Sequence, residues 1–163
     1  MKNGKTWVSL ILCLMLCVVS LTLDVNASGG EYQVGDTIDG SLLTTDTSAE
    51  AIAQHLTRGT YLSNGSSYLQ NCGNGVLFIS GETNCYRLSS SIQVTLFVER
   101  LVNGNWESVS QHTYTNSNDY KVSGGYYLTV SKGYYYRVVG SHSASANGVY
   151  ESSTSRTNGI WIG

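Results

Sequence analysis

The chain has 163 residues, with 18 Gly, 12 Tyr, 4 Cys and no Pro, and only 12% of its residues are charged. This length predicts a single domain, and the absence of Pro excludes collagen-like and proline-rich linker sequences. The formal net charge of −2 gives no electrostatic basis for binding nucleic acid or an anionic membrane, and 41% apolar residues argue against a disordered chain.

Residues 1–27 are predicted to form a secretory signal peptide. Two lysines precede an apolar run over residues 7–23, and Val25 and Ala27 place small or apolar residues before a cleavage site. A membrane anchor is the alternative, but a run of this length lies near the lower limit for a span and no basic cluster follows it. We therefore expect export, cleavage after Ala27, and a mature chain of 136 residues with no stable membrane span.

Residues 28–57 are predicted to be a flexible lead that contains one short helix. Thr47 and Glu50 fit a helix N-terminal capping box, and the apolar residues of 48–58 recur at helical spacing. Gly59 follows as a typical C-terminal stop. A helix this short must dock on another element to be stable.

Two cysteines remain after cleavage, Cys72 and Cys85, and outside the cytosol such a pair is predicted to form a disulfide. The bridge would enclose 12 residues and would stabilise the fold by about 3 kcal/mol. The alternatives are a redox pair, which would favour a C-x-x-C motif that is absent, and a structural zinc site, for which two cysteines are too few. We therefore predict a local disulfide bond between neighbouring strands, and neither a metal site nor a cofactor.

From Tyr61 onward, apolar residues tend to recur at every second position, as in half-buried strands. Asn-Gly, the preferred sequence of tight type I′ turns, occurs five times beyond residue 27, which predicts repeated chain reversals. The pairs lie at 64–65, 74–75, 103–104, 147–148 and 158–159. Strands are expected near 61–71, 75–80, 85–89, 91–102, 106–115, 120–123, 125–131, 134–146, 149–156 and 159–162.

Many short strands separated by turns predict an all-β fold over residues 58–163. We expect an antiparallel β-sandwich, immunoglobulin- or fibronectin-like in style, after one short N-terminal helix; a closed β-barrel is the alternative. Tyr136 follows a Gly-x-x-Tyr turn, which makes it the candidate for the tyrosine corner of immunoglobulin-like sandwiches.

Tyrosines on the strands near 125–131 and 134–146 are expected to emerge on both faces of the sheet. Tyr127, Tyr135 and Trp161 are the candidates for an outer aromatic surface that stacks on sugar rings or fills a protein-binding patch. The alternative is a purely structural role, because Tyr is a good strand former. The strand at 159–162 would also invite strand addition if it lies at an edge.

His142 and Glu151 lie on the strands that flank the turn at 147–148, and with a nearby Ser they could form a small hydrolase site. The alternative is a cross-strand polar pair that fixes register. The G-x-S-x-G elbow and the H-E-x-x-H motif are absent, so we expect no enzyme. Residues 64–66 formally match a glycosylation acceptor, but we interpret Asn64-Gly65 first as a turn.

Several segments carry a resemblance to a known family, in their residues and in their order and spacing: 58–63 (Arg-Gly-Thr-Tyr-Leu-Ser), 79–83, 98–106, 133–142 and 157–162. Together they are similar to an uncharacterised family of small secreted proteins of Gram-positive bacteria, known only as a domain of unknown function. The resemblance covers about residues 58–162 and implies a secreted β domain. It implies no activity.

Export, a single β domain, low charge and the tyrosines together favour a secreted, non-enzymatic binding or interaction module at the bacterial surface. Its partner would be an unknown protein or a cell-wall glycan. A bacteriocin- or toxin-like protein and a small secreted hydrolase are the alternatives. Against the former, no basic amphipathic segment of the membrane-active kind occurs.

Overall fold

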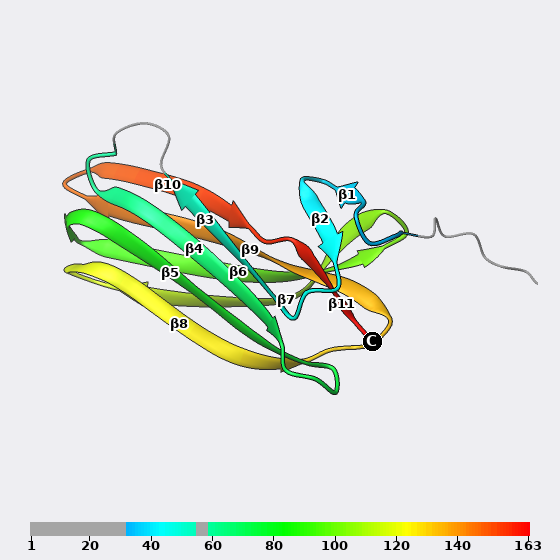
Figure 1. Ribbon diagram of the computed structural model, residues 1–163. Coiled ribbons are helices and arrows are strands. Elements are labelled where there is room, and N and C mark those ends of the chain that lie inside the picture. The colour runs from blue at the N-terminus through cyan, green and yellow to red at the C-terminus, as the bar shows by residue number, and fades with distance from the viewer. Residues whose placement is uncertain (1–31, 55–58) are drawn as a thin grey trace, which may run out of the picture.

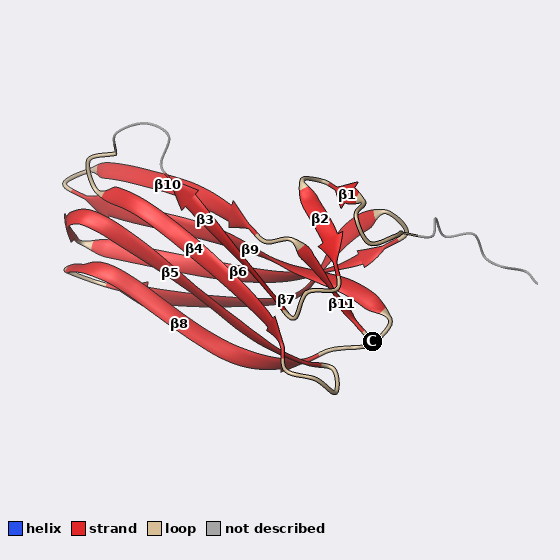
Figure 2. Cartoon of the chain, in the orientation of Figure 1, coloured by secondary structure: helices blue, strands red, loops and turns tan. Residues whose placement is uncertain are grey.

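The computed structural model describes residues 32–54 and 59–163, and this part of the chain is all-β, without a helix (Figures 1 and 2). Its strands form two sheets, neither of which closes into a barrel. In chain order they are β1 (Thr37–Ile38), β2 (Ser41–Thr44), β3 (Ser48–Gln54), β4 (Leu62–Asn71), β5 (Val76–Ser89), β6 (Ser91–Val102), β7 (Asn105–Asn116), β8 (Asp119–Thr129), β9 (Tyr134–Ala146), β10 (Val149–Arg156) and β11 (Gly159–Ile162). The all-β prediction is confirmed, and the barrel alternative is wrong. The predicted signal peptide lies outside the described residues.

One sheet has seven strands and the other has four. The larger sheet runs in the order β1-β2-β11-β9-β6-β7, with β10 also paired to β9, and the smaller sheet runs β3-β4-β5-β8. The paired strands are antiparallel except for β2 and β11, which run parallel through Leu43 opposite Gly159 and Thr44 opposite Ile160. The expected edge at 159–162 is therefore partly covered by β2.

The two sheets pack face to face around one main apolar core. Leu77 and Ile79 of β5 and Val94 and Leu96 of β6 are fully buried in the same cluster, although they belong to different sheets. The residues between them, such as Phe78, point to the outer faces. The period-2 pattern of the sequence is thus satisfied by a two-layered, sandwich-like arrangement.

The predicted helix at 48–58 is wrong in its described part. Residues 48–54 form β3, which pairs antiparallel with β4 from Gln70 back to Asn64. Alternation places small alanines such as Ala53 inward and Ile52 outward, 65% exposed. An alanine-rich segment of this length fits the helical period of 3.6 residues and the strand period of 2 equally well. Pairing with the neighbouring strand β4 selects the strand. The lead therefore contributes three strands rather than a helix.

Three of the five Asn-Gly pairs form the predicted turns. Both residues have positive φ at 74–75, 103–104 and 147–148, as type I′ turns require. The pair at 64–65 lies inside β4, and Gly159 of the last pair lies in β11, so the turn prediction is wrong at these two places.

The predicted disulfide is also wrong, since Cys72 and Cys85 are both free. Cys72 follows β4 at the β4–β5 turn, whereas Cys85 pairs with Leu62 at the opposite end of the same hairpin. The ten residues of β4 separate these two ends by about 30 Å. A disulfide spans Cα atoms less than about 7 Å apart, so the hairpin keeps the thiols unpaired.

The side chain of Tyr136 is buried at the start of β9, and its hydroxyl donates a hydrogen bond of 2.8 Å to the carbonyl oxygen of Ser131. Burial raises the pKa of the Tyr136 phenol, so the hydroxyl stays protonated and able to donate. This is the contact that a tyrosine corner makes with the backbone upstream of it.

We expect Tyr136→Phe to destabilise the protein by about 1 kcal/mol or more, because the Ser131 carbonyl loses its buried donor. The free energy of unfolding in urea measures the effect. Tyr127→Phe, which alters a largely exposed ring, is the matched control and should leave stability nearly unchanged. Equal urea midpoints for the Tyr136 variant and the parent would refute a corner role.

Candidate functional site

Four segments from distant parts of the sequence meet at one end of the molecule. Figure 1 shows the β1–β2 hairpin, the β6–β7 turn, the turn before β9 and the C-terminal strand β11 at that end. The fold thus gathers turns and a strand terminus there, which is where loops of a rigid β domain commonly bind ligands.

A pocket of about 360 Å³ lies at this end. Its volume is near the lower limit of small-molecule sites, which is about 300 Å³. Four of its lining residues are aromatic: Tyr32, Tyr134, Tyr135 and Trp161. The aliphatic side chain of Leu101 and the amide side chain of Asn103, in the β6–β7 turn, also line it.

The rings are placed by register as well as by packing. Tyr135 of β9 lies directly opposite Trp161 of β11, and their ring centroids are 5.0 Å apart in an edge-to-face arrangement. Tyr32 packs from the N-terminal side against the small cluster formed by Leu43, Leu101 and Tyr135. Trp161 remains 39% exposed, whereas Tyr135 is only 7% exposed. The pocket therefore offers one accessible indole above a buried phenol.

The lining of the pocket is uncharged, since none of its side chains is acidic or basic. Burial raises the pKa of Tyr135, and the nearby carboxylate of Asp36 raises it further. The phenol therefore remains neutral at physiological pH. An apolar aromatic wall with neutral amide and hydroxyl groups suits a neutral ligand that has both apolar faces and hydroxyl groups.

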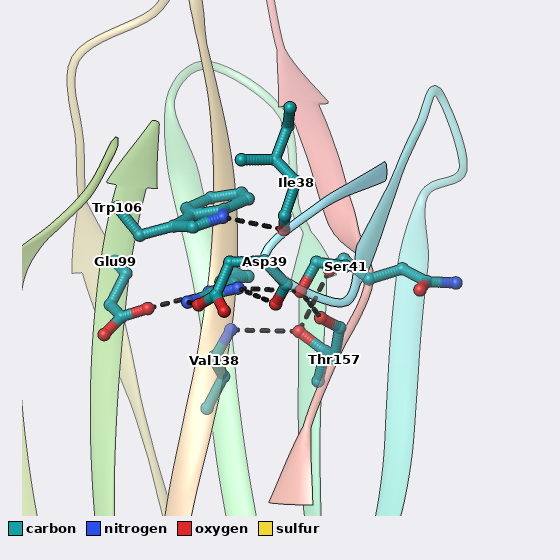
Figure 3. Close-up of polar contacts among 9 residues, drawn as sticks. Ile38, Asp39, Ser41, Glu99, Trp106, Val138 and Thr157 are labelled. Atoms are coloured by element: carbon teal, nitrogen blue, oxygen red, sulfur yellow. Dashed lines mark hydrogen bonds and ion pairs between the residues drawn. The ribbon is translucent and has the colours of Figure 1, made fainter. Parts of the chain in front are cut away.

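The buried Arg137 of β9 links the β1–β2 hairpin to β6, and Figure 3 shows its partners Asp39, Ser41 and Glu99. Arg137 Nε donates to Glu99 Oε2 at 2.7 Å, and Nη2 donates to Asp39 Oδ2 at 2.9 Å. Nη1 donates to the Asp39 carbonyl oxygen at 3.1 Å and to Ser41 Oγ at 3.0 Å. The guanidinium carbon lies 4.3 Å from the centroid of the Trp106 ring.

The hairpin supplies complementary contacts of its own. Trp106 Nε1 donates to the carbonyl oxygen of Ile38 at 3.1 Å, and Ser41 Oγ donates to the carbonyl oxygen of Thr157 at 2.9 Å. The hydrogen bond from Arg137 holds the pKa of the Asp39 carboxyl below its usual range, so the pair is ionised at neutral pH. These contacts hold the segment that follows Tyr32 and so keep that ring at the pocket.

The predicted aromatic surface is divided between two places. Tyr135 and Trp161 come together in the pocket, whereas Tyr127 lies on the outer face of the other sheet and is 70% exposed. There its ring centroid is 5.1 Å from that of Phe78, which in turn lies 6.4 Å from that of Tyr68. The three candidates therefore do not form one stripe.

Sequence reasoning missed Tyr32 and Arg137. Tyr32 stands in a polar segment without periodicity, so nothing in the sequence ties it to β9. Arg137 carried a usable signal, because it is the one charged residue in the otherwise aromatic and aliphatic run 134–139. A charged side chain that is buried with such a run needs a partner of opposite charge, here supplied by Glu99 and by Asp39 of the β1–β2 hairpin.

The proposed catalytic pair does not assemble. The Glu151 carboxylate accepts hydrogen bonds from the backbone N–H groups of residues 60, 61 and 62, at 2.6, 3.0 and 2.7 Å. His142 is fully buried between the sheets, with Nδ1 3.0 Å from Thr83 Oγ1 and Nε2 2.8 Å from Ser155 Oγ. Burial lowers the pKa of His142 to about 4, so the imidazole is neutral at pH 7.

These features define a small two-sheet β domain with an aromatic pocket at one end. The chain belongs to a family of unknown function (DUF6147), whose model matches residues 28–160. No curated protein and no solved structure matches the chain. Within the described residues, no helix has the length and apolar character needed to cross a membrane.

Proposed function

We propose that the protein is a secreted, non-enzymatic binding module whose end pocket takes a neutral sugar of a cell-wall glycan. The observation that carries the proposal is the uncharged pocket lined by Tyr32, Tyr134, Tyr135 and Trp161. Flat aromatic faces pack against the C–H faces of sugar rings, and the Asn103 amide can bond to their hydroxyl groups.

Export is part of this proposal. The family match begins at residue 28, the first residue after the expected cleavage at Ala27, which supports a mature domain that starts there. N-terminal sequencing of protein recovered from the culture medium tests this part, and a sequence that begins at Met1 would contradict it.

We also propose that the two sheets have an immunoglobulin-like topology, and the order of their strands supports this. β5 crosses to β6 in the opposite sheet, β6 forms a hairpin with β7, and β8 returns to pair with β5. β9 then crosses to pair with β6 and continues into β10 and β11, beside which β2 runs parallel. This is the order of strands B, C, C′, E, F and G of an immunoglobulin domain, and Tyr136 opens the strand in the F position.

Trp161→Ala is expected to weaken binding of oligosaccharides of N-acetylglucosamine about tenfold, because the exposed indole is the main stacking surface of the pocket. Isothermal titration calorimetry of the purified protein measures the dissociation constants. The same assay with soluble peptidoglycan fragments tests a longer ligand.

Tyr127→Ala is the matched control, since it removes an exposed aromatic ring from the other sheet. We expect this variant to bind the oligosaccharides as the parent does. Equal loss in both variants would contradict a site at the pocket, and absence of heat with every glycan would contradict glycan binding altogether.

A further inference from the structure

β8 presents a long, open backbone edge. It pairs with β5 on one side and ends the order of the four-stranded sheet on the other. It runs for 11 residues, Asp119–Thr129, and its register with β5 is continuous from Lys121 to the end of the strand. In an immunoglobulin-type sheet a further strand lies at this position.

The direction of the free backbone groups follows from one hydrogen bond. The Val130 N–H donates to the Gly75 carbonyl oxygen at 2.8 Å, so it points toward β5. Because backbone groups alternate along a strand, those of Ser123, Gly125 and Tyr127 point to the open side. The Lys121 carbonyl agrees with this alternation, since it accepts a bond of 3.1 Å from the Asn116 side chain on the open side.

Other edges of the described sheets are shorter or interrupted. β3 has 7 residues and β10 has 8. β7 has 12 residues, but its register with β6 shifts so that Val109 has no partner. A bulge of this kind twists an edge and discourages pairing. β8 is therefore the edge best suited to accept another strand.

The sequence of β8 is complementary to itself when two copies run antiparallel about Gly124. On the inner face, Val122 of one copy faces Tyr126 of the other, a β-branched residue opposite an aromatic one. On the outer face, Lys121, whose ammonium group also pairs with Glu82, faces Tyr127, which is 70% exposed in the isolated chain. Like charges do not meet in this register, and glycines meet at its centre.

We propose that two copies of the chain associate through β8, forming one continuous eight-stranded sheet with a two-fold axis at Gly124. The free donors and acceptors of each edge are then satisfied by the other copy, as in strand addition. The apolar inner residues Val122 and Tyr126 face each other across this register, and no two like charges do, so a second copy of the strand is a complementary partner.

Sedimentation equilibrium of the full chain over a wide range of concentrations tests the proposal, with a reversible monomer–dimer equilibrium as the expected result. Ser123→Pro removes an N–H that faces the open edge and leaves the bonds to β5 in place, so it should weaken the dimer at least about tenfold. Ser123→Ala, which keeps that N–H, is the matched control and should dimerise as the parent does.

Amide hydrogen exchange of the unmodified protein gives an independent test that needs no variant. Protection of Ser123, Gly125 and Tyr127 should rise with protein concentration, while Tyr126 and Leu128, which bond to β5, should be protected at every concentration. A protein that stays monomeric, a dimer that Ser123→Pro leaves intact, or uniform exchange along β8 would each overturn the proposal.

Discussion

Arg137→Met is expected to destabilise the protein by about 3 kcal/mol and to free the β1–β2 hairpin from the sheet. The Arg137 side chain is 3% exposed and joins Glu99, at 2.7 Å, to Asp39, at 2.9 Å. Removing the cation leaves Glu99, which is largely buried, without its partner, and an unpaired buried charge is strongly destabilising. Urea denaturation measures the loss, and limited proteolysis before residue 45 measures release of the hairpin.

Two further variants separate this cluster from a general effect of charge. Arg156→Met removes an exposed arginine that also lies near Asp39, and it should change stability by less than about 0.5 kcal/mol. Arg137→Lys keeps the charge but loses the planar fork and the contact with Trp106, so it should recover only part of the stability. If Arg137→Met and Arg156→Met behave alike, the cluster does not hold the hairpin.

Gly65→Ala is expected to cost about 3 kcal/mol, because a Cβ at this position of β4 would overlap the imidazole ring of His142. The ring cannot move aside, because it is buried between the sheets and its two nitrogens are hydrogen-bonded to the Thr83 and Ser155 hydroxyl groups. Thermal or urea unfolding of the single variant measures the cost.

A double-mutant cycle identifies the cause of that cost. His142→Ala alone should also be destabilising, because it opens a buried cavity and removes one of the hydrogen bonds of Thr83 and one of those of Ser155. In Gly65→Ala/His142→Ala the new methyl group finds space, so the double variant should be more stable than the sum predicts by about 2 kcal/mol. Ser66→Ala, on the opposite face of β4, should be nearly neutral. Simple additivity would show that His142 is not the obstacle.

The sequence predicted most strands from β4 onward closely, because two local signals agreed there. It wrongly divided β5 into strands at 75–80 and 85–89, and β8 into strands at 120–123 and 125–131. In β6, alternation from Ile92 to Val98 specified which residues face the core, and all four apolar residues of this set are fully buried. Asn-Gly pairs at 103–104 and 147–148 fixed the ends of neighbouring strands. Where period and turn residues agree, little else is needed to place a strand.

The failures occur where one local pattern fits two structures. Ala49 to Ala53 satisfies a helical and an alternating pattern alike, and the partner strand β4 decides between them. Asn64-Gly65 has the composition of a turn, but its glycine is required by contact with His142, more than seventy residues away. Contacts of this kind are set by the whole fold and leave no mark in a short window of sequence.

The pocket could be predicted only in part for the same reason. Tyr135 and Trp161 were candidates because they lie on strands with a recognisable pattern. Tyr32 reaches them through a hairpin whose docking depends on Arg137, and that dependence is a tertiary contact between segments almost one hundred residues apart in sequence.

The parallel pairing of β2 with β11 also sets an order of assembly. The Leu42 N–H donates to the Asn158 side chain across 116 positions of the sequence, so the first strands of the seven-stranded sheet have their partner in its last one. Contacts this distant in sequence form late, because a long loop must close first. A chain that emerges from its N-terminus therefore keeps the β1–β2 hairpin without its neighbour in the larger sheet until β11 has been made.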